Sequence, residues 1–287
     1  MKGIVLAGGT GSRLWPVTRA VSKQLLPIYN KPLIYYPIST LMLAKIREIL
    51  VIVNPSDLNQ FQELLGNGED FGVEIEYCVQ NEPRGIADAF IVGKNFIGKD
   101  SSALILGDNI FYGQGLGVKL QQYTDVVGAQ IFGYPVHDPN RYGVVELNKN
   151  SEVISIEEKP ENPKSNLAVP GLYFYDNSVI DLARSIKPSA RGELEISTIN
   201  QLYLSKNQLR ATRLERGTAW FDTGTFDSMH AASSFIQVIE QRQGFMIACL
   251  EEIAWRNEWI SLSQLSQSAQ RYRDSSYRNY LLNLPAH

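Results

Sequence analysis

Short runs of hydrophobic residues, rich in Val and Ile, alternate with helical patterns through the first half of the chain. Four runs are mostly apolar, which is typical of strands covered on both faces; they lie at 3–7, 49–53, 73–79 and 103–106. Helical patterns fill the intervals, at 33–45, 56–65 and 86–96. This alternation predicts an α/β fold with a Rossmann-like, mostly parallel central sheet and helices on both of its faces.

Local signals indicate where the helices begin and end. Ser56 suits the N-cap of the second helix, and Gly66 suits its end. Pro32 suits the start of the first helix, whereas Pro37 inside it predicts a kink.

The second half of the chain contains two regions with different hydrophobic patterns. Closely spaced strand patterns come first and predict added strands and hairpins on the central sheet, at 130–134, 142–147, 153–156 and 172–175. After Thr225, helical patterns follow with no strand between them, at 226–241, 251–259, 261–268 and 277–282. We therefore expect a catalytic core over 1–225 and a C-terminal helical appendage over 226–287, too small to be a catalytic domain of its own.

Composition and charge exclude several partners. Hydrophobic residues make up 44% and charged residues 20%, which is ordinary for a folded domain. The net charge of −3 predicts neither nucleic acid nor an anionic membrane as a partner. No segment approaches the roughly 20 apolar residues of a membrane span, and the expected compartment is the cytoplasm.

Cysteine and histidine do not indicate a metal site. Cys78 and Cys249 lie far apart in apolar sequence and are expected to be reduced core residues. His137, His230 and His287 share no metal-ligand spacing, so zinc is not expected.

A Gly-rich turn follows the first strand, with the sequence Gly8-Gly9-Thr10-Gly11-Ser12-Arg13. Three glycines within four residues let several N–H groups converge as an anion nest, and Arg13 adds a fixed cation. The spacing matches neither the P-loop nor the dinucleotide fingerprint. A tight surface turn is the alternative, but a position after the first strand of an α/β sheet favours phosphate binding.

Lys23 follows ten residues after Arg13 and precedes an apolar stretch ending in Pro27. Taken alone it could be a solvated surface charge. Anchored by its apolar neighbours, it could instead reach the same phosphates from the other side of the turn.

Several further motifs occur in order along the chain: Gly107-Asp108-Asn109, Arg141-Tyr142-Gly143, Glu157-Glu158-Lys159-Pro160, Gly171-Leu172-Tyr173 and Trp220-Phe221-Asp222-Thr223-Gly224. Together with the Gly-rich turn and Lys23-Gln24, these blocks resemble the sugar-1-phosphate nucleotidyltransferases and, more narrowly, the glucose-1-phosphate thymidylyltransferases. The resemblance extends from Lys2 to about Leu282.

The resemblance implies that dTTP and α-D-glucose 1-phosphate are converted to dTDP-glucose and pyrophosphate, the first step of dTDP-deoxysugar biosynthesis such as that of dTDP-L-rhamnose. The sugar phosphate attacks the α-phosphorus directly and in line with the departing pyrophosphate. Since both reactants are anions, the site must neutralise charge and align the attack.

The family pattern assigns roles to five charged residues. Asp108 and Asp222 would hold Mg²⁺, which takes few protein ligands and shares phosphate oxygens. Arg13 and Lys23 would contact the nucleotide phosphates. Lys159 would hold the sugar phosphate, although alone it could be a loop charge paired with Glu157.

The same pattern implies two sets of binding residues. The nucleotide set is Leu6, Gly8, Gly9, Thr10, Gly11, Ser12, Arg13, Lys23, Gln24, Gln80, Pro83, Gly85 and Asp108. Gln24 and Gln80 carry amides that can pair with a pyrimidine edge, and Gly85 would let the base approach the backbone. The sugar-phosphate set is Tyr142, Gly143, Glu158, Lys159, Val169, Gly171, Tyr173, Trp220 and, as a weaker candidate, Arg191.

The chain departs from the family pattern at five positions. Trp15 replaces a common Tyr, Ile86 a Leu and Asp88 a frequent Gln. Pro170 stands where Thr is usual, and Gln114 replaces a His in a region tied to feedback inhibition. We expect Asp88 to tune the preference for a base without abolishing it.

The helical appendage resembles the part of the family that forms subunit contacts. The resemblance implies a homotetramer with an allosteric nucleotide site that includes Gly115, Gly217, Glu252 and Arg256. A helical cap over the sheet is the alternative.

Two other functions remain open at this point. One is a nucleotidyltransferase for CTP, UTP or ATP, and the other is an inactive nucleotide-sugar sensor. Lys23-Gln24 and Gln80 favour the thymidylyl form, and the five charged residues together argue against an inactive protein.

Overall fold

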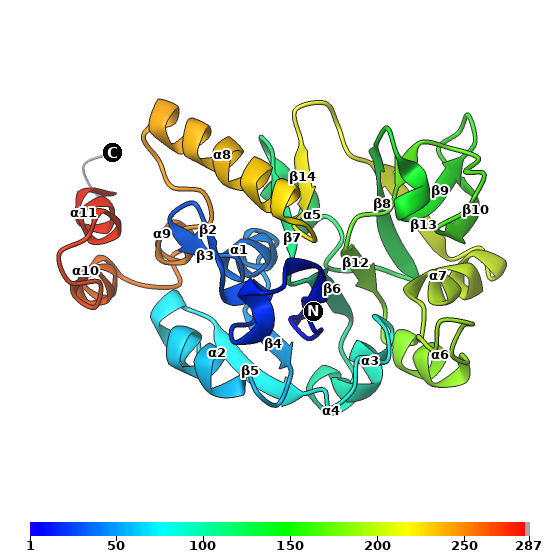
Figure 1. Cartoon of the computed structure of the whole chain (residues 1–287), viewed down its shortest axis with the longest axis horizontal. Coiled ribbons are helices and arrows are strands. Elements are labelled where there is room, and N and C mark those ends of the chain that lie inside the picture. Colours follow the sequence, from blue (N-terminus) through cyan, green and yellow to red (C-terminus); the bar gives the residue numbers. More distant parts are fainter. Residues whose placement is uncertain (285–287) are drawn as a thin grey trace.

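The computed structural model of the chain describes residues 1–284, so that the last three residues of the predicted appendage, including His287, lie outside it. Its centre is a ten-stranded sheet in the order β10-β9-β11-β8-β12-β6-β1-β4-β5, with β13 pairing beside β8 (Figure 1). The predicted α/β fold is confirmed.

The half of the sheet that carries the Gly-rich turn is parallel. Its strands are β1 (Lys2–Leu6), β4 (Glu48–Val53), β5 (Glu74–Val79) and β6 (Ser102–Leu106). The strand β1 pairs in parallel with β4 on one side and with β6 on the other. These are the four strands predicted from the apolar runs, and each differs from its prediction by one residue at most at either end.

The other half of the sheet holds the added strands. The strand β12 (Leu172–Tyr175) is antiparallel to β6 and to β8 (Ala129–Pro135). Beyond β8 lie β9 (Gly143–Leu147) and β10 (Val153–Glu158), as predicted. The short β11 (Leu167–Ala168) and β13 (Leu209–Arg213) also join β8 but were not predicted.

Alternate residues of the parallel strands face two separate cores. Val5 and Val51 contribute to one core and Ile4 and Leu50 to the other. The first core is covered by α1 (Tyr35–Leu43), α2 (Leu58–Leu65) and α5 (Leu116–Gln121). The second is covered by α3 (Asp88–Val92), α4 (Lys94–Ile97), α6 (Val179–Ser185) and α7 (Ile196–Ser205). Helices therefore cover both faces of the sheet.

Three local predictions need correction. Asp57, not Ser56, occupies the N-cap position of α2, while Gly66 ends that helix as predicted. Pro37 causes no interior break, because α1 begins at Tyr35 and the proline lies in its first turn, where no intrahelical N–H bond is required. The helix predicted over 86–96 is interrupted at Gly93, where a β-carbon would lie 2.9 Å from the carbonyl oxygen of Ala89 and 3.0 Å from Leu50.

Two small sheets lie outside the central one. The strands β7 (Asn109–Tyr112) and β14 (Ala219–Asp222) pair antiparallel, and β2 (Pro27–Ile28) pairs with β3 (Lys31–Pro32). A third core, which includes Ile28, Ile110 and Ile236, joins both sheets to the long helix α8 (Phe226–Gln243).

The C-terminal segment is helical, as predicted. Thr225 caps α8 in a capping box with Ser228. Three more helices follow: α9 (Leu250–Arg256), α10 (Leu262–Gln270) and α11 (Ser276–Asn283). Figure 1 places α10 and α11 at the end of the molecule opposite β9 and β10. Over residues 1–284, no helix has the length and apolarity that crossing a membrane requires.

Candidate active site

The carboxyl ends of the parallel strands meet at one edge of the sheet. The strand order reverses at β1, because β4 and β5 follow on one side of it and β6 is added on the other. Such a switch point opens a crevice where ligands bind in α/β sheets. The Gly-rich turn follows β1, Asn54 follows β4, Gln80 follows β5 and Asp108 lies two residues beyond β6.

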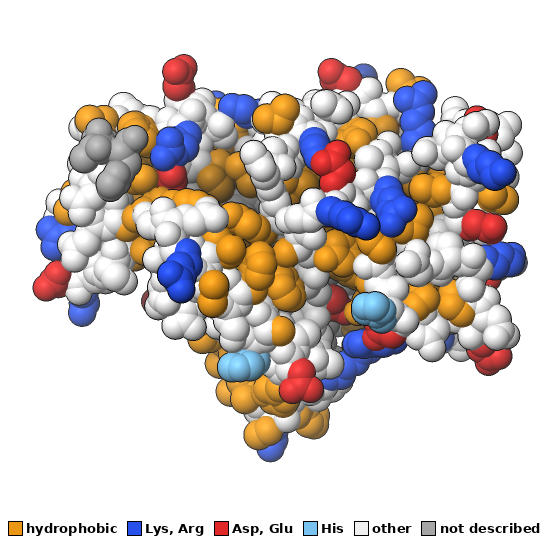
Figure 2. Space-filling model, turned by 90° about the horizontal axis from the view of Figure 1, so that it is seen from above, with side chains coloured by type: hydrophobic (Ala, Val, Ile, Leu, Met, Phe, Trp, Pro, Cys, Tyr) orange, Lys and Arg blue, Asp and Glu red, His pale blue; other side chains and the backbone are white. Residues whose placement is uncertain are grey.

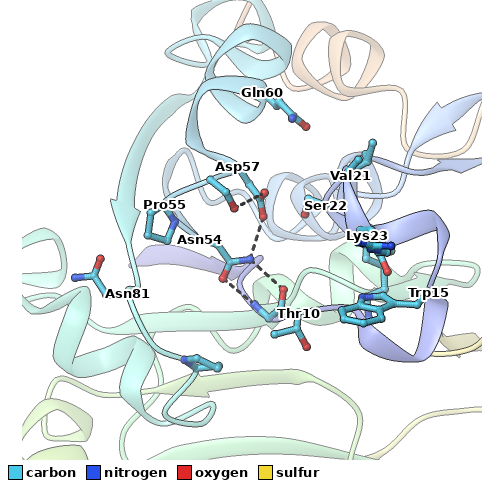
Figure 3. A pocket seen from close by; sticks show the side chains of 16 residues that line it. Thr10, Trp15, Val21, Ser22, Lys23, Asn54, Pro55, Asp57, Gln60 and Asn81 are labelled. Atoms are coloured by element: carbon cyan, nitrogen blue, oxygen red, sulfur yellow. Dashed lines mark hydrogen bonds between the residues drawn. The ribbon is translucent and has the colours of Figure 1, made fainter.

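The Gly-rich turn is held by a side chain that sequence reasoning missed. Gly9 has a φ of 112°, which favours glycine. Its N–H donates to Oδ1 of Asn54 at 3.1 Å, and its carbonyl accepts from Nδ2 of Asn54 at 3.0 Å. Asn54 also donates to Asp57 at 3.0 Å (Figure 3). The only sequence signal was a polar residue directly after a buried strand.

A hollow of about 460 Å³ lies beside this turn (Figure 3). Gly9, Thr10, Lys23 and Pro83 of the predicted nucleotide set line it. Gln24 and Gln80 are buried behind the surface, with 5% and 6% of their area exposed. Leu6 is partly buried at the end of β1, and Ser12 begins a short 3₁₀ turn for which Gly11 is the N-cap.

A second hollow of about 550 Å³ has Asp108 in its wall. Every residue of the predicted sugar-phosphate set except Arg191 lines it, namely Tyr142, Gly143, Glu158, Lys159, Val169, Gly171, Tyr173 and Trp220. Arg13, Asp108 and Asp222 line it too. Residues from six motifs that are far apart in the sequence thus meet around one cavity.

The two aspartates are brought together by the β7–β14 pair. Asp222 is the register partner of Asn109, the residue after Asp108. Thr223 fixes the same junction, since its N–H and its hydroxyl both donate to the carbonyl of Asp108, at 3.0 and 2.8 Å. Lys23 donates from Nζ to the Asp108 carboxylate.

Electrostatics differ between the two carboxyls. Burial favours the neutral acid at Asp108, but the charge of Lys23 and hydrogen bonds from Lys23 and Asn109 outweigh it, so that the pKa of Asp108 is lowered. Burial raises the pKa of Asp222, and the charge of Asp108 raises it further. Arg13 and Lys23 act against this rise. The cations near Asp222 therefore do not outweigh burial and the charge of Asp108 in setting its pKa.

Asn109 connects the two aspartates to the sugar-side hollow. It is 2% exposed and donates from Nδ2 to Asp108 at 2.8 Å. Its Oδ1 accepts from the backbone N–H of Gly171 at 3.0 Å and from Nε1 of Trp220 at 2.7 Å. Its place in the Gly107-Asp108-Asn109 motif predicts none of these contacts.

The charged residues at the rim form an exposed network. Lys159 has a left-handed backbone with a φ of 43°, and its N–H donates to the carbonyl of Tyr142 at 3.0 Å. Its Nζ lies 3.9 Å from Glu158. Arg191 lies outside the hollow, 3.4 Å from Glu158, and pairs mainly with Glu195 at 2.9 Å.

The loop after β5 is pinned from behind. The N–H of Leu194 donates to the carbonyl of Arg84 at 2.7 Å, and Ala87 donates to Leu194 at 3.1 Å. Gly85 has a φ of 105°, and a β-carbon there would lie 2.5 Å from the Leu194 carbonyl oxygen. The absence of a side chain at Gly85 therefore allows the close contact with the backbone of Leu194. The approach of a base to Gly85 stays a prediction.

The predicted allosteric residues do not all meet within one chain. Gly115, Glu252 and Arg256 line a hollow of about 400 Å³ between α5 and α9. Gly217 lines a different hollow, with Arg213 and Arg216.

No third ligand joins the aspartate pair to make a protein-only metal cage. Within residues 1–284, no group of three or more His, Cys, Asp or Glu side chains could hold a metal ion. Two clustered carboxylates suit Mg²⁺ only when a substrate phosphate completes the ligand set.

Comparison with known proteins gives consistent matches. The nucleotidyl transferase family model matches residues 2–238. The glucose-1-phosphate thymidylyltransferase of Mycolicibacterium smegmatis is 57% identical over 284 residues, and that of Neisseria meningitidis 56% over 285, covering 99% of each chain in both cases.

Two solved structures share the fold. A Bacillus anthracis protein described as a glucose-1-phosphate thymidylyltransferase, crystallised in complex with a sucrose, is 40% identical with a TM-score of 0.76, covering 82% of this chain and 94% of that one. A UDP-glucose pyrophosphorylase complexed with UDP-glucose, 21% identical, has a TM-score of 0.74 over 83% of this chain and 98% of its own, which shows the fold alone.

Proposed function

This chain belongs to the nucleotidyl transferase family and, within it, to the glucose-1-phosphate thymidylyltransferases, and we propose that it converts dTTP and α-D-glucose 1-phosphate to dTDP-glucose and pyrophosphate. One observation carries the proposal: Asp108 and Asp222 lie together in the wall of the hollow that the predicted sugar-phosphate set lines, and Lys23, which lines the hollow beside the Gly-rich turn, pairs with Asp108.

The residues of this chain divide the work between the two substrates. The N–H groups of the Gly-rich turn, with Arg13 and Lys23, neutralise the triphosphate and the departing pyrophosphate. Lys159 holds the phosphate of the sugar so that its oxygen faces the α-phosphorus. The protein supplies no nucleophile, and the rate gain comes from alignment and charge neutralisation.

Polar groups around the sugar-side hollow would read the hydroxyls of glucose. Glu158 accepts from them. Burial, and then the charges of Glu158 and Asp108, raise the pKa of Tyr173, which keeps its phenol neutral and able to donate. Asn200 lines the same hollow, and its buried Nδ2 has no protein hydrogen-bond partner among the described residues.

Asp108 and Asp222 are the residues that would hold Mg²⁺. Their fit is supported by the raised pKa of Asp222 beside the Asp108 charge, which a cation would relieve. When bound, the ion would offset the negative charge of the substrate phosphates.

The base would lie between the Gly-rich turn and the loop after β5, near Gln80, Pro83 and Gly85. Gln24 lies behind Gly107, where a β-carbon would come within 3.0 Å of Gln24 and 2.9 Å of the Leu6 carbonyl oxygen. These positions support contacts with a pyrimidine nucleotide.

We further propose a homotetramer with an allosteric nucleotide site. The helix α8 leaves Phe226 and Val238 about half exposed, and Figure 2 shows hydrophobic side chains gathered across the middle of the face seen from above. Such patches are typical of subunit contacts. Assembly could bring Gly217 of one copy to the Gly115, Glu252 and Arg256 hollow of another.

The free thiols of Cys78 and Cys249 suit a reducing compartment, so we place the enzyme in the cytoplasm. The product would feed deoxysugar synthesis such as that of dTDP-L-rhamnose.

The test is to incubate the chain with dTTP, α-D-glucose 1-phosphate and Mg²⁺ and to identify the nucleotide product by chromatography and mass spectrometry. The account expects dTDP-glucose, and in reverse the release of dTTP from dTDP-glucose and pyrophosphate. An unchanged dTTP pool in both directions would contradict it.

A further inference from the structure

Asp88 is a buried carboxylate next to the proposed base site that the mechanism above does not use. It lies in the first turn of α3, and its side chain is fully buried. Its Oδ2 accepts from Nε2 of Gln80 at 2.7 Å, and its Oδ1 accepts from a terminal nitrogen of Arg84, also at 2.7 Å. Both oxygens are therefore engaged by donors.

This pairing fixes which way the amide of Gln80 faces. An ionised carboxylate accepts hydrogen bonds and cannot donate them, so it holds the nitrogen of Gln80 and repels the oxygen. The oxygen is left on the side of the Gly-rich turn, where Oε1 lies 3.1 Å from the position that a β-carbon on Gly8 would take. Backbone bonds between Leu194 and the carbonyl of Arg84 and the N–H of Ala87 hold the loop that carries this pair.

The two kinds of pyrimidine present opposite patterns to such an amide. Thymine and uracil offer an N3–H donor beside the O4 acceptor, whereas cytosine offers an N3 acceptor beside its amino donor. In the observed orientation, Gln80 can accept from N3–H with its oxygen and donate its second Nε2 hydrogen to O4. Reading cytosine requires the reversed amide, with its oxygen against the carboxylate of Asp88.

We propose that Asp88 is a positioning residue that sets the orientation of Gln80 and thereby selects thymine and uracil nucleotides over cytosine nucleotides. The inference rests on the proposed function, because it takes Gln80 as a contact of the base. Asp88 itself touches neither substrate.

The test is the substitution Asp88→Asn, which keeps the shape and removes the charge. Arg84 can only donate, so it retains the oxygen of the new asparagine, whose NH₂ then faces Gln80 and favours the reversed amide. The readout is the ratio of kcat/KM for dUTP to that for dCTP, two nucleotides that differ only on the edge being read. Since mispairing a buried polar group costs about a hydrogen bond or more, the ratio should fall by about tenfold or more.

The matched control is Asp57→Asn. Asp57 also accepts from a side-chain amide near the Gly-rich turn, that of Asn54, but it does not contact Gln80 in the structure. This variant should leave the dUTP-to-dCTP ratio within about twofold of the wild type, even where it slows turnover of both nucleotides.

Folding of each variant is checked by its thermal melt, and Asp88→Ala replaces Asp88→Asn where the latter does not fold. With no partner at position 88, Gln80 is free to rotate and the ratio should still fall, though less. An unchanged ratio in a folded variant, or a wild type that uses dCTP as well as dUTP, would overturn the role of Asp88.

Calorimetric binding of dTTP, dUTP and dCTP to the same proteins separates the two proposals. A wild type that binds dUTP over dCTP, and loses that preference in Asp88→Asn, supports the role of Asp88 even if dTDP-glucose is not formed. Formation of dTDP-glucose with an unaltered binding ratio contradicts the role of Asp88 and leaves the proposed function intact.

Discussion

The two aspartates of the site differ in what surrounds them. Asp108 is paired with Lys23 and held by Asn109, while Asp222 is partly buried beside a like charge. A substrate–metal complex would change the partners of both, since it brings positive charge to Asp222 and competes with Lys23 for Asp108. The Lys23–Asp108 pair is thus suited to hold the site in order before the substrates arrive.

Replacing Asp108 by Asn should abolish most activity without unfolding the protein. The variant loses one of the two charges proposed for Mg²⁺ and the ionic partner of Lys23, so kcat/KM should drop by about a hundredfold or more. The Asp108 carbonyl keeps its two bonds from Thr223, and the thermal melt should shift by only a few degrees.

Asp100→Asn is the matched control, because Asp100 lies at the surface 3.9 Å from Lys2. It should turn over like the wild type. Near-normal turnover of Asp108→Asn would refute the proposed metal pair.

At the scale of single residues, the sequence indicated the candidate site residues that lie in a recognisable motif. The sugar-phosphate set converged on one hollow as expected, with Arg191 displaced to its rim. The roles of Asn109 and Asn54 were not predicted, because they depend on hydrogen-bond partners far away in the sequence. Asn109 bonds residues 62 and 111 positions away, and Asn54 bonds Gly9 from 45 positions away. No local pattern encodes such contacts.

Most apolar runs were predicted as strands, the four-residue β12 among them, but β7 and β14 were missed. The strands β7 and β14 have four residues each and bring Asp108 and Asp222 together. Runs of that length cannot be told from loop or buried helix by periodicity alone. The interruption at Gly93 was also missed. The contact with Leu50 that requires a glycine there comes from a strand far away in the sequence.

The β2–β3 hairpin is tied to α8 by a buried ion pair between Lys31 and Glu240. Their Nζ–Oε1 distance is 2.8 Å, and the two side chains are 1% and 6% exposed. Glu240 also accepts from Asn30 at 2.7 Å and from the backbone N–H of Ile247 at 2.8 Å. Burial lowers the pKa of Lys31, and the charge of Glu240 acts against that shift.

Lys31→Met should lower the free energy of unfolding by about 3 kcal/mol, because it leaves the charge of Glu240 buried without a cation. The double variant with Glu240→Gln should recover part of that loss, since neither position is then charged. Urea unfolding measures both.

Lys2→Met is the control. Its pair with Glu48 is more exposed, with 48% of the Glu48 side chain accessible, and it should cost less than about 1 kcal/mol. If Lys31→Met lowered the free energy of unfolding by as little as Lys2→Met does, the buried pair would have no structural role.

At the scale of the molecule, the C-terminal helices complete the core. Leu250 and Ala254 of α9 join the same buried cluster as Ile38 of α1, and Ala232 and Ile236 of α8 cover Ile110 of β7. Sequence alone could not decide between core and interface for this segment, because an apolar helical face suits both. The structure assigns these residues to the core, while α8 retains an exposed apolar side.

Removal of residues 226–287 should therefore leave a chain that does not fold cooperatively, although it retains all five charged residues of the site. Because the truncation exposes the hydrophobic cores, the chain should be insoluble or should melt over a broad temperature range when followed by circular dichroism. A truncated chain with a sharp transition near that of the full chain would contradict this view.

The residues of the two hollows, linked by the Lys23–Asp108 pair, are proposed to join a thymidine nucleotide to a sugar phosphate, and pyrophosphate release by the full chain tests this most directly. The assay pairs dTTP, dUTP, UTP, dCTP, CTP and ATP with glucose, galactose and mannose 1-phosphates in the presence of Mg²⁺. The account predicts fastest release with dTTP and glucose 1-phosphate, tolerance of dUTP, and loss of release in Asp108→Asn. Fastest release with CTP, or release from no pair, would contradict it.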